Sequence, residues 1–179
     1  GAAIMANVEH KVSLISGIHD LLPNRTGGAI MQKNLEILGD IQYTQDEIDF
    51  ALDMQKANGK PLIGIDGKIR PLRETLESPG GGSTDVGDVS YNMPVVSLAV
   101  TTAPKGVPWH SWSVVASSGM SIGHKGMLHA AKALGMSMID IYKDKKLREE
   151  IKKEFDERIG DYNYDPYLNP GPPPIDYVD

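Results

Sequence analysis

A run of apolar residues in the middle of the chain restricts the fold more than any other feature of the sequence. Residues 94–101 have the sequence Pro-Val-Val-Ser-Leu-Ala-Val-Thr, in which β-branched or small apolar residues occupy both alternating faces. A strand with two apolar faces suits the interior of a sheet that is covered by helices. The run therefore predicts an α/β fold in which this segment is an interior strand.

Helical patterns precede the run. Thr26 can cap a helix that ends at Gly39. The segment Thr44-Gln45-Asp46-Glu47 is a capping box, in which a hydroxyl and a carboxylate three residues apart satisfy each other's backbone donors. The helix that it opens is expected to end at about Asn58, with Gly59 in the left-handed closing position.

Two further helices are predicted after the run. The first begins at about Ser121, and its apolar residues recur at helical spacing and form one continuous face: Met127, Ala131, Leu134, Met138 and Ile141. The second is highly charged and ends at Gly160, and its narrower apolar stripe consists of Leu147, Ile151, Phe155 and Ile159.

The two ends of the chain have weaker patterns. Residues 8–14 alternate between apolar and polar, which predicts a half-buried strand with His10 on its inner face as a hydrogen-bonded core residue. His19, near the end of that strand, has no assigned role. The segment 161–179 combines tyrosines with prolines and is either a surface strap or a disordered end, and the tyrosines favour the strap.

Charge and residue counts exclude several classes of protein. The 179 residues carry a formal net charge of −6, and this argues against a nucleic-acid partner, whose phosphates need an excess of Lys and Arg. The chain contains no cysteine, which excludes disulfides, thiolate metal ligands and a cysteine nucleophile. No apolar run approaches the roughly 20 residues that cross a bilayer. We therefore expect a cytoplasmic protein without membrane contact.

Two segments are candidates for chemistry. His110 lies in a loop between the expected interior strand and a helix, where α/β enzymes gather ligands. The glycine-rich segment 80–88 can bring backbone amides close to an anion, such as a substrate carboxylate, at the start of a helix. The alternative for this segment is a flexible connection followed by an ordinary capped turn.

The order of five motifs resembles the carboxy-terminal part of the co-catalytic zinc peptidases and amidohydrolases, which include carboxypeptidase G and aminoacylase. Within them, the sequence is most similar to the aminobenzoyl-glutamate utilization protein B subfamily. The motifs that carry the resemblance are Leu22–Thr26, Gly82–Ser90, Trp109–Trp112, His124–Lys132 and Pro166-Tyr167.

The resemblance implies a catalytic α/β domain with a mostly parallel sheet flanked by long helices, and a smaller lid domain that also mediates dimerisation. It places residues 1–20 at the end of the lid domain, with its last strand, and residues 21–179 in the second half of the catalytic domain. Because residues 1–7 resemble the last turns of a helix, we expect the sequence to be a fragment that lacks the first half.

The resemblance also implies a site. It makes His110 a metal ligand, and it places near the substrate Asn24 and the loop residues Gly82, Ser83, Thr84 and Asp85. The other ligands and the glutamate base belong to the first half of the family chain, so no catalytic residue is expected in this segment. Two divalent metal ions, zinc or manganese, are expected in the parent protein, and none bound stably by this chain alone.

The reaction implied for the parent is hydrolysis of the amide bond of a small N-acyl amino acid, such as aminobenzoyl-glutamate, and the fragment alone is expected to be inactive. Its expected partners are the missing first half and other subunits, in a homodimer or a hetero-oligomer. The alternative function is a non-catalytic small α/β module for anion binding or protein interaction, in which the segment 80–85 binds the anion and the histidines are structural.

Overall fold

The computed structural model describes residues 1–12, 14–72, 84–168 and 171–172. Helices account for just over half of these residues, and none of them lies in a strand. The helices are α1 (Ala2–Ala6), α2 (Arg25–Leu38), α3 (Gln45–Ala57), α4 (Val86–Ser90), α5 (Trp112–Ser118), α6 (Ser121–Lys143) and α7 (Lys145–Ile159). None of these helices has the length and the apolar character needed to cross a membrane.

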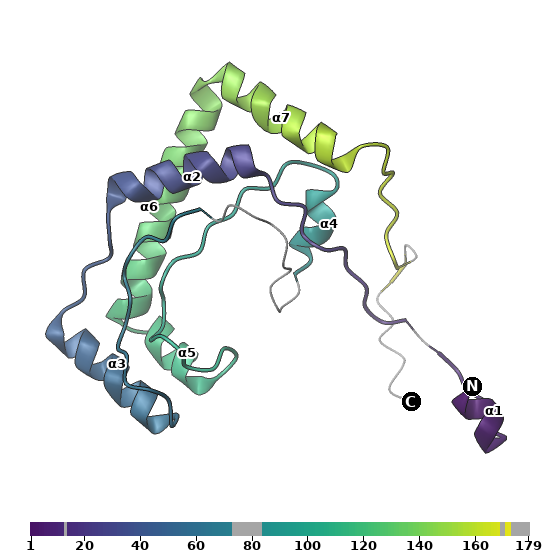
Figure 1. The fold of residues 1–179 in the computed structure, drawn as a ribbon, viewed down its shortest axis with the longest axis horizontal. Coiled ribbons are helices and arrows are strands. Elements are labelled where there is room, and N and C mark those ends of the chain that lie inside the picture. The colour runs from purple at the N-terminus through teal and green to yellow at the C-terminus, as the bar shows by residue number, and fades with distance from the viewer. Residues whose placement is uncertain (13, 73–83, 169–170, 173–179) are drawn as a thin grey trace.

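Helices α2, α6 and α7 form one packed group (Figure 1). Helix α2 packs on both α6 and α7, and α5 packs on α6. The core lies where Met31 and Leu35 of α2 meet Ala133 of α6. Three residues of the extended segment 94–101 pack on this core: Val96, Leu98 and Val100.

The predicted α/β fold with a mostly parallel sheet is wrong for the part of the chain that the structure describes. The segment 94–101 packs Val96, Leu98 and Val100 on the core, but its other face is not covered as predicted, because Ser97 and Ala99 are exposed. A strand requires backbone hydrogen bonds to a neighbouring strand, and the backbone of residues 95–100 makes none with another described residue. The pattern identified a segment that packs on the core with one face, and it did not reveal that no neighbouring strand pairs with it in the described part of the chain.

The predicted lid strand at residues 8–14 is also wrong. The described residues of this segment form no strand, and their side chains are exposed, with exposed fractions of 82% for Val12 and 61% for Leu14. His10, which was expected in a core, is likewise exposed. No other described segment packs on the apolar side of residues 8–14, so alternation alone does not bury it.

The helix ends follow the predicted local chemistry. The capping box is present, since the Thr44 hydroxyl accepts from the Glu47 amide and the Glu47 carboxylate accepts from the Thr44 amide. Gly59 has a φ of +61°, as expected for the closing position. Helix α2 begins one residue before Thr26, because Asn24 caps it instead, and it ends before Gly39 as predicted.

The apolar face predicted for the long helix is not the face that it buries. Met127, Leu134 and Met138 are 60%, 41% and 69% exposed. The buried face of α6 is lined by smaller residues: Ile122, Gly126, Ala133 and Ser137. Small residues allow α2 to approach closely, and the bulky stripe remains on the outside.

An ion pair anchors α6 to the start of α3. The Lys125 ammonium lies 2.6 Å from a Glu47 carboxylate oxygen, and Glu47 is only 3% exposed. Burial raises the pKa of Glu47, but hydrogen bonds from Lys125, Ser121 and Thr44 outweigh it and lower the pKa to about 2. The carboxylate is therefore ionised in the folded protein at all but strongly acidic pH.

This ion pair predicts that the contact between α6 and the start of α3 loses stability in acid. Because the folded pKa of Glu47 lies below its ordinary value of 4.5, its contribution is complete above pH 4.5 and is lost as the pH falls toward 2. At pH 7 we expect Glu47→Gln to lower the free energy of unfolding by about 3 kcal/mol. Urea unfolding at pH 7 and pH 2.5 measures this difference, which should shrink at the lower pH. The exposed Glu149→Gln is the control, and an equal loss at both pH values would contradict the prediction.

Candidate functional site

Asn24 is a buried structural residue at the joint between α2 and α7. Its side-chain oxygen accepts a hydrogen bond from the Gly27 amide at 2.8 Å, and its side-chain nitrogen donates to the Ile151 carbonyl of α7 at 2.9 Å. Asn24 is only 6% exposed. Both ends of the amide are thus occupied within the protein in this structure.

A carboxylate of α7 completes the same joint. The two Glu154 oxygens accept from the backbone amides of Arg25 and Thr26 at 2.8 and 2.7 Å. These are free donors of the first turn of α2, where a negative charge is stabilised. Burial raises the pKa of Glu154, but the two amides and Arg158 outweigh it and lower the pKa to about 2. The Leu22–Thr26 motif therefore forms an anion site that the protein's own glutamate fills.

His110 lies in an exposed loop immediately before α5. Its backbone φ is +58°, in the left-handed region that residues with a Cβ rarely adopt. A turn hydrogen bond from the Ser111 hydroxyl to the Pro108 carbonyl, 2.6 Å long, closes the loop around it. The neighbouring Trp109 is 69% exposed. The imidazole is thus open to solvent or to a partner, on a backbone of restricted conformation.

The glycine-rich loop is described only in part. Gly82 and Ser83 lie outside the described residues, whereas Thr84 and Asp85 are exposed at the start of α4. The Thr84 hydroxyl accepts from the Val86 amide at 3.3 Å, and the Asp85 side chain makes no capping bond. The Thr84 bond closes a local turn and does not cap the helix, because the N-cap residue of this five-residue helix is Asp85, whose side chain makes no capping bond.

The predicted site residues do not come together. Asn24 lies at the start of α2 and Thr84 and Asp85 precede α4, whereas His110 precedes α5, and α4 and α5 are well separated in Figure 1. In the described ranges, no three His, Asp or Glu side chains are placed to hold a metal ion. The residues present, with one exposed imidazole as the predicted ligand, do not fit a two-metal centre on their own.

A polar cluster that the sequence did not predict is centred on His19. This residue is 5% exposed. Its Nδ1 is 2.8 Å from an Asp88 carboxylate oxygen, and its Nε2 is 2.8 Å from the Tyr162 hydroxyl. The Tyr164 hydroxyl donates to the same Asp88 oxygen at 3.1 Å. Both ring nitrogens are therefore occupied.

Aromatic rings enclose His19. Tyr167 stacks on the imidazole with ring centroids 4.3 Å apart and an interplanar angle of 3°. Tyr91 and Tyr164 lie against it at 5.1 and 5.2 Å. Three of the tyrosines of this cluster come from the segment 161–168, so the surface strap predicted for the end of the chain is confirmed over these residues.

The electrostatics of the cluster keep its groups in their ordinary charge states. The hydrogen bond from His19 lowers the pKa of Asp88. Burial, together with Asp20, raises the pKa of Tyr91 to about 12. Burial and neighbouring acidic groups also raise the pKa of Tyr162 and Tyr164. The cluster thus contains a carboxylate and neutral phenols, and it offers no activated nucleophile.

A cavity of about 520 Å³ lies between α2, α6 and the segments 66–72 and 97–107. Its walls are mainly apolar and include Met31, Leu98 and Val100. The His129 Nε2 atom is buried there without a hydrogen-bond partner in the described part of the chain. None of the described residues predicted for the site lines this cavity, although Trp109 and His129, which belong to two of the motifs, do.

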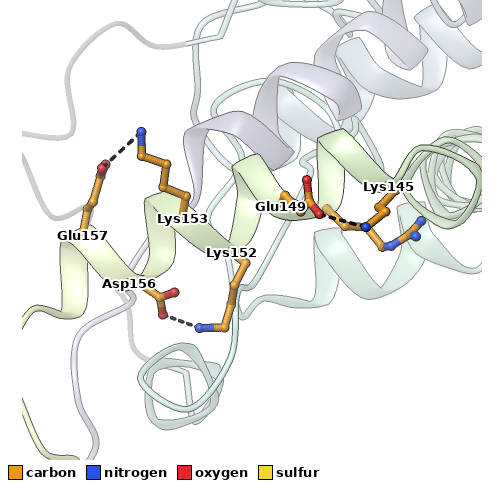
Figure 2. A pocket seen from close by; sticks show the side chains of 7 residues that line it. Lys145, Glu149, Lys152, Lys153, Asp156 and Glu157 are labelled. Atoms are coloured by element: carbon orange, nitrogen blue, oxygen red, sulfur yellow. Dashed lines mark hydrogen bonds and ion pairs between the residues drawn. The ribbon is translucent and has the colours of Figure 1, made fainter.

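A second, shallow depression lies on the surface of α7 (Figure 2). Its charged side chains pair along the helix, with Lys145 and Glu149 3.5 Å apart and Lys153 and Glu157 3.6 Å apart. Exposed pairs of this kind contribute only about 0.3–0.5 kcal/mol each. The alternating charges are those of a solvated helix face.

Comparison with known proteins gives one informative match. No family model matches the chain, and no solved structure matches it significantly. The chain is 30% identical over 178 aligned residues to a subunit of the p-aminobenzoyl-glutamate hydrolase of Escherichia coli strain K12. The match covers 86% of this chain, and the chain spans 37% of the length of that relative. The resemblance inferred from the ordered motifs is confirmed as similarity to this hydrolase subunit.

Proposed function

We propose that this chain is one part of a metal-dependent hydrolase that cleaves the amide bond of p-aminobenzoyl-glutamate or of a similar N-acyl amino acid. The observation that supports the proposal most is the 30% identity over 86% of the chain to a subunit of such a hydrolase. The chain spans only 37% of that relative, so the complete activity requires residues beyond those of this sequence.

In this proposal His110 supplies one ligand to a divalent metal centre. Its exposed position and its restricted backbone support a role toward a group outside this chain. Divalent ions such as zinc or manganese supply Lewis-acid activation of an amide carbonyl. A single imidazole does not hold such an ion, and the remaining ligands and the general base come from the rest of the hydrolase. This chain alone is therefore inactive and holds no ion stably.

In this proposal Asn24 has a structural role, in contrast to the exposed residues Thr84 and Asp85. Because its amide is fully engaged within the α2–α7 joint, it orients the start of α2 rather than contacting substrate directly. Thr84 and Asp85 are exposed, so the Thr84 hydroxyl and the backbone amides of these two residues are the donors that we propose for a substrate carboxylate. The Asp85 carboxylate repels such a group and instead limits how it approaches.

The exposed apolar side of α6 supports the proposal that this chain binds a large partner. Three bulky residues on it, Met127, Leu134 and Met138, are exposed, and monomeric proteins seldom leave contiguous apolar surface open to water. The partner that we propose is the remainder of the hydrolase, in the same polypeptide or in another subunit of a hetero-oligomer. The relative is itself named as a subunit, which is consistent with such an assembly.

The test uses this chain and a longer protein that contains it together with the remaining length of the relative. With added zinc or manganese, the longer protein is expected to release p-aminobenzoate from p-aminobenzoyl-glutamate, and the 179-residue chain is expected to release none. In the longer protein, His110→Ala should remove bound metal and activity together, as measured by elemental analysis and product release.

The matched control is His124→Ala, which replaces another exposed histidine in a motif of the same resemblance and should retain both properties. Hydrolysis by the short chain alone would contradict the proposed division of the site. Full metal content and activity in the His110 variant would contradict the role of that residue.

A further inference from the structure

Helix α4 is too short to hold its own position. It has five residues, Val86–Ser90, and an isolated helix of that length is unstable in water. The main contacts between helices in the described part of the chain join α2, α5, α6 and α7, and α4 takes part in none of them. In Figure 1, α4 lies beside the segment that leads into α2. The contacts with that segment therefore decide where α4 lies.

Two residues of that segment hold α4 along its length. The Asp88 carboxylate lies 2.8 Å from the Nδ1 atom of His19, and since a carboxylate only accepts, the ring donates. The Gly87 backbone lies so close that a Cβ atom added there would be 1.9 Å from the His19 carbonyl oxygen. The Ser90 hydroxyl, on a residue that is 0% exposed, accepts from the Leu22 amide at 2.8 Å. Three of the five residues of α4 are therefore in contact with the segment.

Three tyrosines of the strap fix the His19 ring. The Nε2 atom of the ring is 2.8 Å from the Tyr162 hydroxyl, and Tyr167 stacks on the ring with centroids 4.3 Å apart. The Tyr164 hydroxyl donates at 3.1 Å to the same Asp88 oxygen that His19 contacts. The imidazole is therefore held at both nitrogens and on one face, so it presents Nδ1 to Asp88 in one geometry.

Thr84 is tied to the residues that His19 holds. The Gly87 amide donates to the Thr84 carbonyl at 3.1 Å, and the Val86 amide donates to the Thr84 hydroxyl oxygen at 3.3 Å. Because the hydroxyl oxygen accepts this bond, its proton remains available to donate to another acceptor. Thr84 is exposed. A displacement of α4 therefore also displaces this exposed donor.

We propose that His19 is a positioning residue: through Asp88 it holds α4, and α4 presents the Thr84 hydroxyl to the substrate carboxylate. His19 itself touches no substrate in this arrangement, because both its ring nitrogens are occupied within the protein. The inference rests on the proposed function, which assigns the carboxylate contact to Thr84. It adds that a buried histidine outside the predicted site determines how strongly the substrate binds rather than how fast its amide bond is cleaved.

Two substitutions of His19 separate its two contacts in the longer protein. His19→Asn places an amide nitrogen where Nδ1 lies and keeps the donor to Asp88, whereas His19→Gln places its amide near Nε2 and loses that donor. With p-aminobenzoyl-glutamate, His19→Gln is expected to raise KM about tenfold and to change kcat by less than about twofold, because a hydrogen bond to a charged group is lost outside the reacting atoms. His19→Asn is expected to keep KM within about threefold of its original value. Gln55→Leu is the control, because it removes another buried polar side chain and should leave KM unchanged.

Hydrogen exchange in the 179-residue chain tests the hold on α4 without any enzymatic activity. His19→Gln should speed exchange of the Gly87 and Asp88 amides about tenfold or more, while exchange in α2 stays as it was. Gly87→Ala is the second variant, for the case that His19→Gln does not fold. It keeps every hydrogen-bonding side chain and favours a helix, but it forces α4 away from the His19 carbonyl, so it should also speed exchange of the Asp88 amide.

The two measurements fail separately. Unchanged exchange in both variants would overturn the positioning of α4 by His19. A KM raised equally by His19→Asn and His19→Gln, or a loss confined to kcat, would overturn the route through Asp88 to the substrate. Absence of hydrolysis by the unaltered longer protein would overturn the proposed function and the Thr84 contact with it, and the exchange rates would still decide whether His19 holds α4.

Discussion

Gln55→Leu is expected to lower the free energy of unfolding by about 3 kcal/mol or more, because one buried amide satisfies several backbone groups. Gln55 is 0% exposed. Its oxygen accepts from the amides of Ile63 and Gly64, both at 2.9 Å. Its nitrogen donates to the carbonyls of Gly64 and Lys105, both at 2.8 Å. Leucine has a similar volume but removes the hydrogen-bond partner of the Gly64 amide and of the Lys105 carbonyl. The Ile63 amide keeps its bond to the Pro61 carbonyl, and the Gly64 carbonyl keeps its bond from the Lys105 amide.

The location of Gln55 explains the size of the effect. Segments 60–64 and 103–106 contain no helix or strand, and the side chain of Gln55 joins them to α3. Urea unfolding followed by circular dichroism measures the loss, and hydrogen exchange should show faster exchange at the Ile63 and Gly64 amides. Gln45→Leu in the same helix, at an exposed position, is the control and should change stability by less than about 0.5 kcal/mol. An equal loss of unfolding free energy in the two variants would contradict the proposed role of Gln55 in joining these segments to α3.

Asn24→Ala is expected to lower the free energy of unfolding by about 2–4 kcal/mol, because it removes a helix cap and a buried contact between helices. The variant leaves the Gly27 amide and the Ile151 carbonyl without their partners. Thermal unfolding of the short chain measures this loss without reference to any enzymatic activity. A role of Asn24 confined to substrate would leave the short chain as stable as before, and that result would contradict the structural role.

A second substitution separates the two contacts of Asn24. Asn24→Asp keeps an acceptor for the Gly27 amide but replaces the donor to Ile151 by a second oxygen. We therefore expect a loss at neutral pH that becomes smaller in acid, where the protonated carboxyl again donates. Gln32→Glu, an exposed change on α2 with its amide paired only to Glu36, is the comparison and should show a much smaller effect on stability.

The local elements were predictable because their determinants are close in sequence. The Thr44–Glu47 capping box, the ends at Gly39 and Gly59, and the buried stripe of α7 depend on residues within a few turns of one another. Whether residues 94–101 form part of a sheet could not be predicted from such local determinants. Residues 94–101 have the composition of an interior strand, but strand formation depends on a neighbour that no pattern within the segment can supply.

The long helix shows why an apolar stripe does not identify the inner face. Met127, Leu134 and Met138 have the larger side chains, yet α2 packs on the side with Ala133 and Ser137. Asn34 of α2 donates to the Ser137 hydroxyl at 3.0 Å, so a polar pair also stabilises the contact. A helix with two possible contact faces can bury either, and the choice depends on the neighbouring helix.

The cluster around His19 was missed for a similar reason. His19 and Asp88 are distant in sequence, and Tyr162 is farther still. The available signal was the density of tyrosines in the segment 161–168, which predicted a strap but not its contact. By contrast, the relationship to a hydrolase subunit was accessible from sequence, because it depends on the order of several short motifs rather than on one contact.

The contacts of His19 also have a consequence for the order of events during biosynthesis. His19 and Tyr162 are 143 positions apart, so their contact closes a long loop, at a cost in chain entropy that rises with loop length. The ribosome adds both His19 and Asp88 long before it adds Tyr162. The His19 imidazole can therefore pair with Asp88 first, and the tyrosines of residues 161–168 pack on it only after the helices between them have been synthesised.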